Sequence, residues 1–244
     1  MVNKPKLVNS SYRELVSFVE KMPDMIEEYG EIAKIFPYSK HVVAAYRWAK
    51  TARIKRFLHS LSSVIDELSE EQRRKFDKII NSEAGGELLA EYSDAVLRTS
   101  SKTAIAALAI LYADVDDKKY VQDFKVAACL VFQGITESSV EAFLELSRVS
   151  EVAEPINGKG PYPMFSADDS LLEKLPNIGK LHRNAEELII STNELIRRGL
   201  LLPEHFIGRY GGTTCPFGVS DITIRFRELL ILARKYAARQ AKDK

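Results

Sequence analysis

The sequence predicts a mainly α-helical protein, with a multi-helix bundle in residues 1–150, a linker or long loop at residues 151–169 and a small module at residues 170–244. Apolar residues recur at spacings of three and four through much of the first segment, which is typical of amphipathic helices. The second segment contains three prolines and two glycines and has no helical period. The third combines a helical pattern with a glycine-rich stretch beside β-favouring residues, which predicts one short β-hairpin.

Composition places the chain among ordinary globular proteins and gives it no strong electrostatic bias. Of its 244 residues, 45% are hydrophobic and 28% are charged, and the net charge is only +1. Cys129 and Cys215 are far apart and suggest no disulfide framework, so we expect a cytoplasmic protein. The longest apolar run, residues 104–113, is half a membrane span and predicts a buried core helix. Residues 1–15 lack the apolar segment of a signal peptide, so neither secretion nor a membrane span is expected.

Helix boundaries in the first half are predicted from caps and breakers. A first helix should begin at residues 10–11 and break at Pro23, because proline removes a helical hydrogen bond. A long helix is expected from residue 38 to about residue 68. Directly after it, Ser69–Gln72 has the pattern of a capping box that opens the next helix.

Three further helical segments follow before residue 150. The pair Gly85–Gly86 predicts a turn, with a helix at residues 87–97 after it and an alanine-rich helix at residues 103–113. Residues 120–149 are apolar at helical spacing and should be interrupted near Gly134, with Thr136 capping the second part.

The C-terminal module is predicted from one well-marked helix and the punctuation after it. Residues 183–198 carry an apolar helical face, and Gly199 is placed to end this helix in a left-handed turn. Residues 209–218 are rich in glycine and threonine and predict a loop, whereas residues 219–224 are rich in β-branched residues. Thr223 can cap the final helix through its hydroxyl.

This order resembles the end of a winged-helix domain, in which a helix, a short strand, a glycine-rich tip, a second strand and a closing segment follow one another. Many winged-helix proteins end in Leu-Thr-x-x-Gly-x-x-Leu-Leu, and the residues at matching steps here are Ile222, Thr223, Leu229 and Leu230. Phe226 replaces the glycine, and Ile224 stands where proline is common. The resemblance implies a wing within residues 208–218 and a role in binding DNA or docking protein.

The resemblance also implies that residues 183–198 form the recognition helix. Arg183 and Asn184 would then face the bases, with Lys180 and Arg209 on the phosphate backbone. Three acidic residues in the helix argue against groove binding, because carboxylates repel phosphates: Glu186, Glu187 and Glu194. The alternative is that this helix only packs the module against its neighbours.

The most pronounced charge pattern lies in residues 32–65, which contain seven Lys and Arg residues and no Asp or Glu. The candidate contacts from this segment are Lys40, Arg47, Lys50, Arg53, Lys55 and Arg56. Such a segment suits phosphates or an acidic protein surface. The alternative is that these cations pair locally with residues 66–67 and 70–71, which are acidic.

No catalytic or metal-binding motif is evident. The four histidines are isolated from one another, and the chain lacks a phosphate-binding loop, a nucleophile elbow and a zinc-protease motif. A nucleophilic Cys215 activated by His205 or His182 is one remaining enzymatic hypothesis. We expect no cofactor and no metal.

Three functional hypotheses follow. The first is a non-enzymatic binding or regulatory protein that contacts nucleic acid through the basic helix and the winged-helix-like module. The overall sequence pattern of such a protein is similar to that of helical proteins of bacteria and phages. The second is a protein–protein interaction or assembly module, in which the partner is an acidic surface or a second copy of the chain. The third is a cysteine-dependent enzyme.

Overall fold

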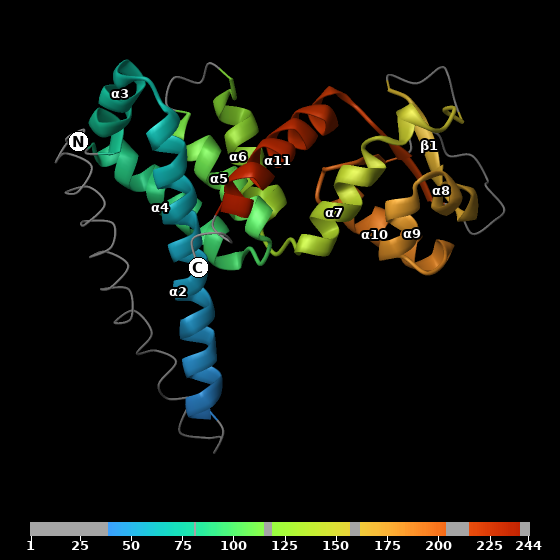
Figure 1. The fold of residues 1–244 in the computed structure, drawn as a ribbon, viewed down its shortest axis with the longest axis horizontal. Coiled ribbons are helices and arrows are strands. Elements are labelled where there is room, and N and C mark those ends of the chain that lie inside the picture. Colours follow the sequence, from blue (N-terminus) through green and yellow to red (C-terminus); the bar gives the residue numbers. More distant parts are fainter. Residues whose placement is uncertain (1–38, 81, 115–118, 157–161, 204–214, 240–244) are drawn as a thin grey trace. The chain divides into compact units, whose positions relative to one another are not determined.

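The computed structural model describes residues 39–80, 82–114, 119–156, 162–203 and 215–239, and it is mainly helical (Figure 1). The chain divides into two units, residues 1–55 and residues 56–244. The boundary expected at residues 151–169 stays a prediction. Among the described helices, none combines the length and the apolar character needed to cross a membrane.

In the first unit, the described residues belong to helix α2 (Ser39–Glu67), which continues into the second unit. The long helix expected from residue 38 to about residue 68 is therefore confirmed. The helix expected to begin at residues 10–11, with its break at Pro23, lies outside the described residues.

In the second unit, α3 (Glu70–Ile80) begins where the sequence predicts it. The backbone N–H of Ser69 donates to the Gln72 side chain at 3.0 Å, and the N–H of Gln72 donates to the Ser69 hydroxyl at 3.3 Å. This reciprocal pair confirms the capping box.

The turn predicted at Gly85–Gly86 is wrong, because α4 (Glu83–Arg98) already includes both glycines in its first turn. A glycine in a helix costs only about 1 kcal/mol relative to alanine. The buried residues later in α4 favour the helix, and packing of Tyr92, Ala95 and Val96 outweighs that cost.

Helix α5 (Lys102–Ala113) is the centre of the helical core and confirms the buried helix predicted from its composition. Every residue from 103 to 113 is buried. Its Tyr112 ring meets three other rings edge-on, with centroids 6.1 Å from Phe57, 5.7 Å from Phe76 and 5.4 Å from Tyr92. These rings come from α2, α3 and α4, so one tyrosine gathers four helices.

Helices α6 (Gln122–Phe132) and α7 (Glu137–Leu146) are separated by the break predicted near Gly134. Gly134 has φ of 70°, a left-handed conformation that glycine adopts without steric cost. The Thr136 hydroxyl accepts the N–H of Ser139 at 3.1 Å, which confirms it as the cap of α7. A short 3₁₀ turn, Val149–Glu151, follows α7.

Three glutamates on α7, one turn apart, connect it to three other helices. Glu137 accepts the hydroxyls of Ser101 (2.6 Å) and Thr103 (2.5 Å) at the start of α5. Glu141 pairs with Arg234 of α11, and Glu145 accepts the Asn177 amide of α9 at 3.2 Å. Hydrogen bonds from α5 hold the pKa of Glu137 below its usual value in spite of its burial. Helix α7 is therefore the common support of the core and the C-terminal elements.

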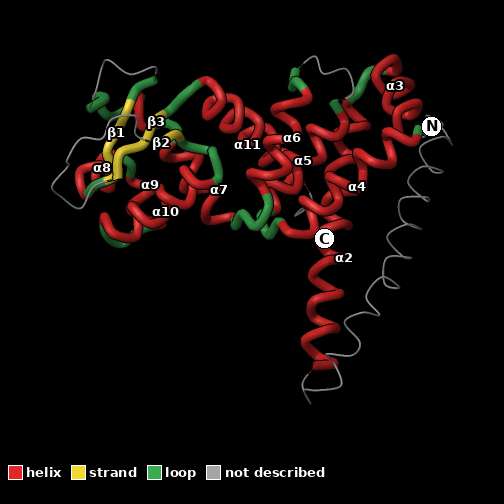
Figure 2. The backbone as a smooth tube through the Cα atoms, turned by 180° about the vertical axis from the view of Figure 1, so that it is seen from behind, coloured by secondary structure: helices red, strands yellow, loops and turns green. Residues whose placement is uncertain are grey.

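The C-terminal elements surround a three-stranded antiparallel sheet, with α8, α9 and α10 beside it (Figure 2). Its strands, in the order β1-β3-β2, are β1 (Met164–Ala167), β3 (Cys215–Gly218) and β2 (Leu202–Pro203). The helices are α8 (Asp169–Lys174), α9 (Pro176–Leu181), α10 (Ala185–Arg197) and α11 (Asp221–Arg239). Phe165 lies opposite Phe217 in the sheet, and both rings are buried. The closing helix, α11, runs back along α5 and α7.

Strand β1 lies near the end of residues 151–169, where the sequence predicts a linker or long loop. The strand expected within residues 219–224 is wrong, because β3 ends at Gly218 and α11 begins at Asp221. Pro216 is tolerated in β3 because β2, as far as it is described, pairs only with Phe217 and Gly218, so that among the described strands Pro216 has a neighbour on one side only. Thr223 does cap α11, but from inside the helix, by accepting the N–H of Ser220 at 3.3 Å.

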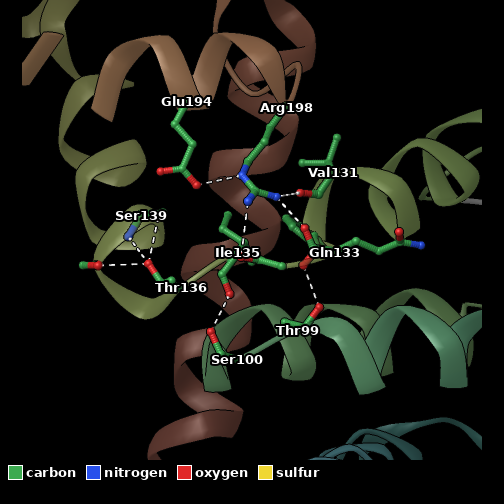
Figure 3. A network of polar contacts seen from close by, with 12 residues as sticks. Thr99, Ser100, Val131, Gln133, Ile135, Thr136, Ser139, Glu194 and Arg198 are labelled. Carbon is green, nitrogen blue, oxygen red and sulfur yellow. Dashed lines mark hydrogen bonds and ion pairs between the residues drawn. The ribbon is translucent and has the colours of Figure 1, made fainter. Parts of the chain in front are cut away.

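Arg198, at the end of α10, holds the C-terminal elements to the α6–α7 turn (Figure 3). Its guanidinium donates to the carbonyls of Val131 (3.4 Å), Gln133 (2.5 Å) and Gly134 (3.2 Å). Its Nε donates to Glu194 at 3.0 Å. A cation here also opposes the negative end of the α6 dipole.

We expect Arg198→Met to lower the free energy of unfolding by roughly 2–3 kcal/mol, because it leaves these carbonyls without their charged donor. Urea unfolding followed by circular dichroism measures the change. Arg74→Met is the matched control, since the Arg74 side chain is 82% exposed and, within the described parts of the chain, pairs only with Glu70 of its own helix. Equal stability of the two variants would contradict the role given to Arg198.

Candidate interaction surface

The structure brings together three residues that the sequence singled out: Lys180, Arg183 and Asn184. Helices α9 and α10 are joined by the three residues His182–Asn184, a turn of the length found in helix-turn-helix motifs. Asn184 caps α10 by accepting the N–H of Glu187 at 3.0 Å. Lys180, in the last turn of α9, donates to Asn177 at 3.2 Å.

Arg183 is held by a carboxylate of the helix that follows it. Its Nε and Nη2 donate to Oε1 of Glu187 at 2.8 and 2.5 Å, and its backbone N–H donates to Oε2 at 2.8 Å. These bonds hold the pKa of Glu187 below its usual value. The Arg183 side chain is 90% exposed, so solvent weakens the pairing. The pair nevertheless presents no net charge to a ligand at this turn.

The exposed face of α10 is a stripe formed by Glu186, Ile190, Asn193 and Arg197. Ile190 is 63% exposed, among the highest values of any large apolar residue in the described chain. Glu186 and Arg197 form no ion pair within the described part of the chain. We call these four residues the α10 stripe.

Sequence reasoning did not identify Ile190 as a surface residue. The signal was present, because Ile190 lies outside the spacing of the buried residues Leu188, Thr192 and Leu195. Within α10, the polar side chains of Asn193 and Arg197 are exposed. Glu194 is instead half-buried against Arg198.

The basic residues of α2 differ in exposure. Lys55 is exposed, whereas Lys50, Arg53 and Arg56 are half-buried and each takes part in at least one interaction. Lys40 and Arg47 lie within α2, but their side chains are outside the described set, as is the whole of Arg209.

Two of the carboxylates expected to neutralise this basic segment have other partners. Glu70 pairs with Arg74 at 3.5 Å, and Glu71 pairs with Lys75 at 3.1 Å. Both pairs lie one turn apart on α3 itself, where the i, i+4 spacing brings the side chains together. Glu70 and Glu71 are therefore engaged within α3, and the alternative that the basic segment pairs locally with residues 66–67 stays a prediction.

Cys215 lies in an environment unlike that of an activated nucleophile. It is buried in β3, and its thiol donates to the Asn193 side chain at 3.4 Å. Burial raises its pKa, which disfavours the reactive thiolate. Burial also raises the pKa of Cys129, to about 12. His205, one of the two histidines proposed as a base for Cys215, lies outside the described residues.

No cluster of three or more His, Cys, Asp or Glu side chains suited to a metal ion is found among the residues that the structure describes. Comparisons with protein-family models, with curated proteins and with solved structures found no match to this chain.

His182, in the α9–α10 turn, is buried, and its Nδ1 has no hydrogen-bond partner within the described structure. Burial lowers its pKa, and this effect outweighs the opposing influence of the Ile178 carbonyl and of Glu187. The fold therefore favours the neutral ring.

We expect the protein to lose stability as the pH falls below about 6.5, the usual histidine pKa in unfolded chains. Below that pH the unfolded state binds a proton at His182 that the folded state resists, and the loss continues down to the lower folded pKa. Urea unfolding at a series of pH values should show a flatter profile for His182→Gln. The exposed His59 provides the control substitution, His59→Gln. If both substitutions flattened the pH dependence of the unfolding free energy equally, the effect would not be specific to His182.

Proposed function

We propose that the C-terminal elements are a winged-helix-like module whose function is to dock protein, and that the protein is a non-enzymatic interaction or assembly factor. The order α10, β2, β3 and α11 supports this, because it is the order that the sequence resemblance implies. The three-residue turn between α9 and α10 is also consistent with it. In this proposal α10 stands in the position of the recognition helix.

The composition of the α10 stripe is the observation that carries the choice of a protein partner. A DNA-reading helix places donors at its N-terminal end and cations around them. Here the first turn of α10 contains Glu186 and Glu187, and Arg183 is engaged with the second of these. The centre of the stripe is Ile190, and an exposed apolar residue within a polar rim is typical of protein interfaces.

Nucleic-acid binding by the basic segment of α2 is a second candidate. It is favoured by the six Lys and Arg residues and the absence of acidic residues between positions 39 and 65 of this helix. The exposure of Lys55 and the engagement of Glu70 and Glu71 with α3 are consistent with it. Phosphate contacts of this kind require no base readout.

Substitutions on α10 should separate the two candidates. Ile190→Asp should abolish co-purification of a protein partner with the full chain, because it places a charge at the centre of the interface. Ile222→Asp is the matched control, since Ile222 is also an exposed isoleucine, at 40%, but lies on α11. Affinity capture with both variants measures the difference.

Binding to duplex and single-stranded DNA and to RNA, followed by fluorescence anisotropy over a salt titration, tests the opposite outcome. We expect Arg183→Glu to change any affinity by less than about two-fold, because Arg183 is already paired and exposed. Salt-sensitive binding that Arg183→Glu abolishes, with no partner lost on Ile190→Asp, would overturn the protein-docking function. Loss on Lys55→Glu alone would assign nucleic-acid binding to α2.

A further inference from the structure

We propose that the partner docked on the α10 stripe is a second copy of this chain, bound through the same stripe about a two-fold axis with the two α10 helices antiparallel. The inference rests on the proposed function in one respect, namely that α10 is a docking face. It adds the identity of the partner and the geometry of the contact.

The spacing of the stripe makes such a contact self-consistent. Its residues lie at positions 186, 190, 193 and 197, so successive steps are four, three and four residues. This series is the same in both directions. An antiparallel copy therefore presents position 197 opposite 186 and position 193 opposite 190. In a two-fold interface each such contact occurs twice.

The charges on the stripe are complementary only in the antiparallel arrangement. Glu186 is in the first turn of α10 and Arg197 is in the last. Each charge is favourable at its end of the helix, because it has the opposite sign to that end of the helix dipole. Turning one helix around brings Glu186 against Arg197 of the second copy, and the reverse pair forms at the other end. A parallel arrangement would place like charges together. Neither side chain has an ion-pair partner within the described part of its own chain to give up.

The centre of the contact combines the two Ile190 side chains with the two Asn193 amides. Positions 190 and 193 lie on either side of the two-fold axis, and three residues of α-helix rise about 4.5 Å. The two Ile190 side chains are therefore close enough to pack against each other and exclude water. Asn193, whose Oδ1 also accepts the Cys215 thiol of its own chain, stands opposite each isoleucine and is exposed, and the charged residues 186 and 197 lie at the two ends. One helix pair buries less surface than a standard interface, so we infer a weak, concentration-dependent dimer.

Charge exchange across the axis provides the test. Sedimentation equilibrium of the full chain should show reversible dimerisation. Glu186→Arg alone and Arg197→Glu alone should each weaken it roughly ten-fold, because either substitution creates two like-charged pairs. The double variant, Glu186→Arg with Arg197→Glu, should restore the dissociation constant to near its original value. Glu173→Arg, an exposed change on α8, should have no effect.

A chain that stays monomeric at all concentrations would overturn the proposal. A dimer that is indifferent to the single substitutions, or that the double variant fails to restore, would also overturn it. Circular dichroism of each variant excludes misfolding as the cause of a lost dimer. If the chain is monomeric yet Ile190→Asp still removes a different co-purifying protein, the docking function holds and only the self-association fails.

Discussion

The guanidinium of Arg198 is the polar contact that fixes the end of α10 against the α6–α7 turn. It lies at the end of α10 and donates to three backbone carbonyls, one in the last turn of α6 and two in the α6–α7 turn, while Glu194 on its own helix balances its charge (Figure 3). The last carbonyls of a helix have no intrahelical donor, and Arg198 supplies donors to Val131 near the end of α6 and to Gln133 and Gly134 just after it. Because α10 begins with a rigid cap at Asn184 and ends at this contact, its exposed face has a defined orientation.

Other helix ends in the second unit are tied in a similar way. The Thr99 hydroxyl donates to the Phe132 carbonyl at 2.6 Å, and the Ser100 hydroxyl donates to the Ile135 carbonyl at 3.0 Å, on the opposite side of the α6–α7 turn from Arg198. Glu137 satisfies the first N–H groups of α5 in addition to two hydroxyls. Apolar packing around α5 and Tyr112 supplies a non-directional driving force, whereas these polar contacts fix which helix end meets which turn.

Much of the helical arrangement could be predicted from the sequence because its signals are local. The capping box at Ser69–Gln72 and the cap at Thr136 depend on residues three apart, and both are confirmed. Strand β1 could not be predicted, since it is four residues long and is stabilised by β3, some fifty residues later in the chain. The turn predicted at Gly85–Gly86 was wrong because tertiary packing of α4 outweighs the small free-energy cost of glycine in a helix.

In the candidate site too, features with local sequence signals could be predicted and features that depend on distant contacts could not. The position of the helix at residues 183–198 and of Gly199, whose φ is 77°, followed from local pattern. The engagement of Arg198 with a turn more than sixty residues away did not, and neither did the exposure of Ile190, which depends on the face of α10 that packs against the sheet and α7. Residue type alone favoured the Lys and Arg residues of residues 32–65 and of the α9–α10 turn as functional groups. The exposure of side chains in the structure instead favours the α10 stripe.

The central claim is that the α10 stripe meets its own copy in an antiparallel contact, and inter-chain disulfide formation tests it most directly. In that contact residue 186 lies against residue 197 of the second copy. Two copies of residue 186 are instead about 16 Å apart along the axis, beyond the reach of a disulfide. A mixture of Glu186→Cys and Arg197→Cys chains should therefore form a covalent heterodimer under mild oxidation, while Glu186→Cys alone should not, and the native cysteines are buried. Equal cross-linking by Glu186→Cys alone, or no cross-linking in the mixture, would contradict the antiparallel contact.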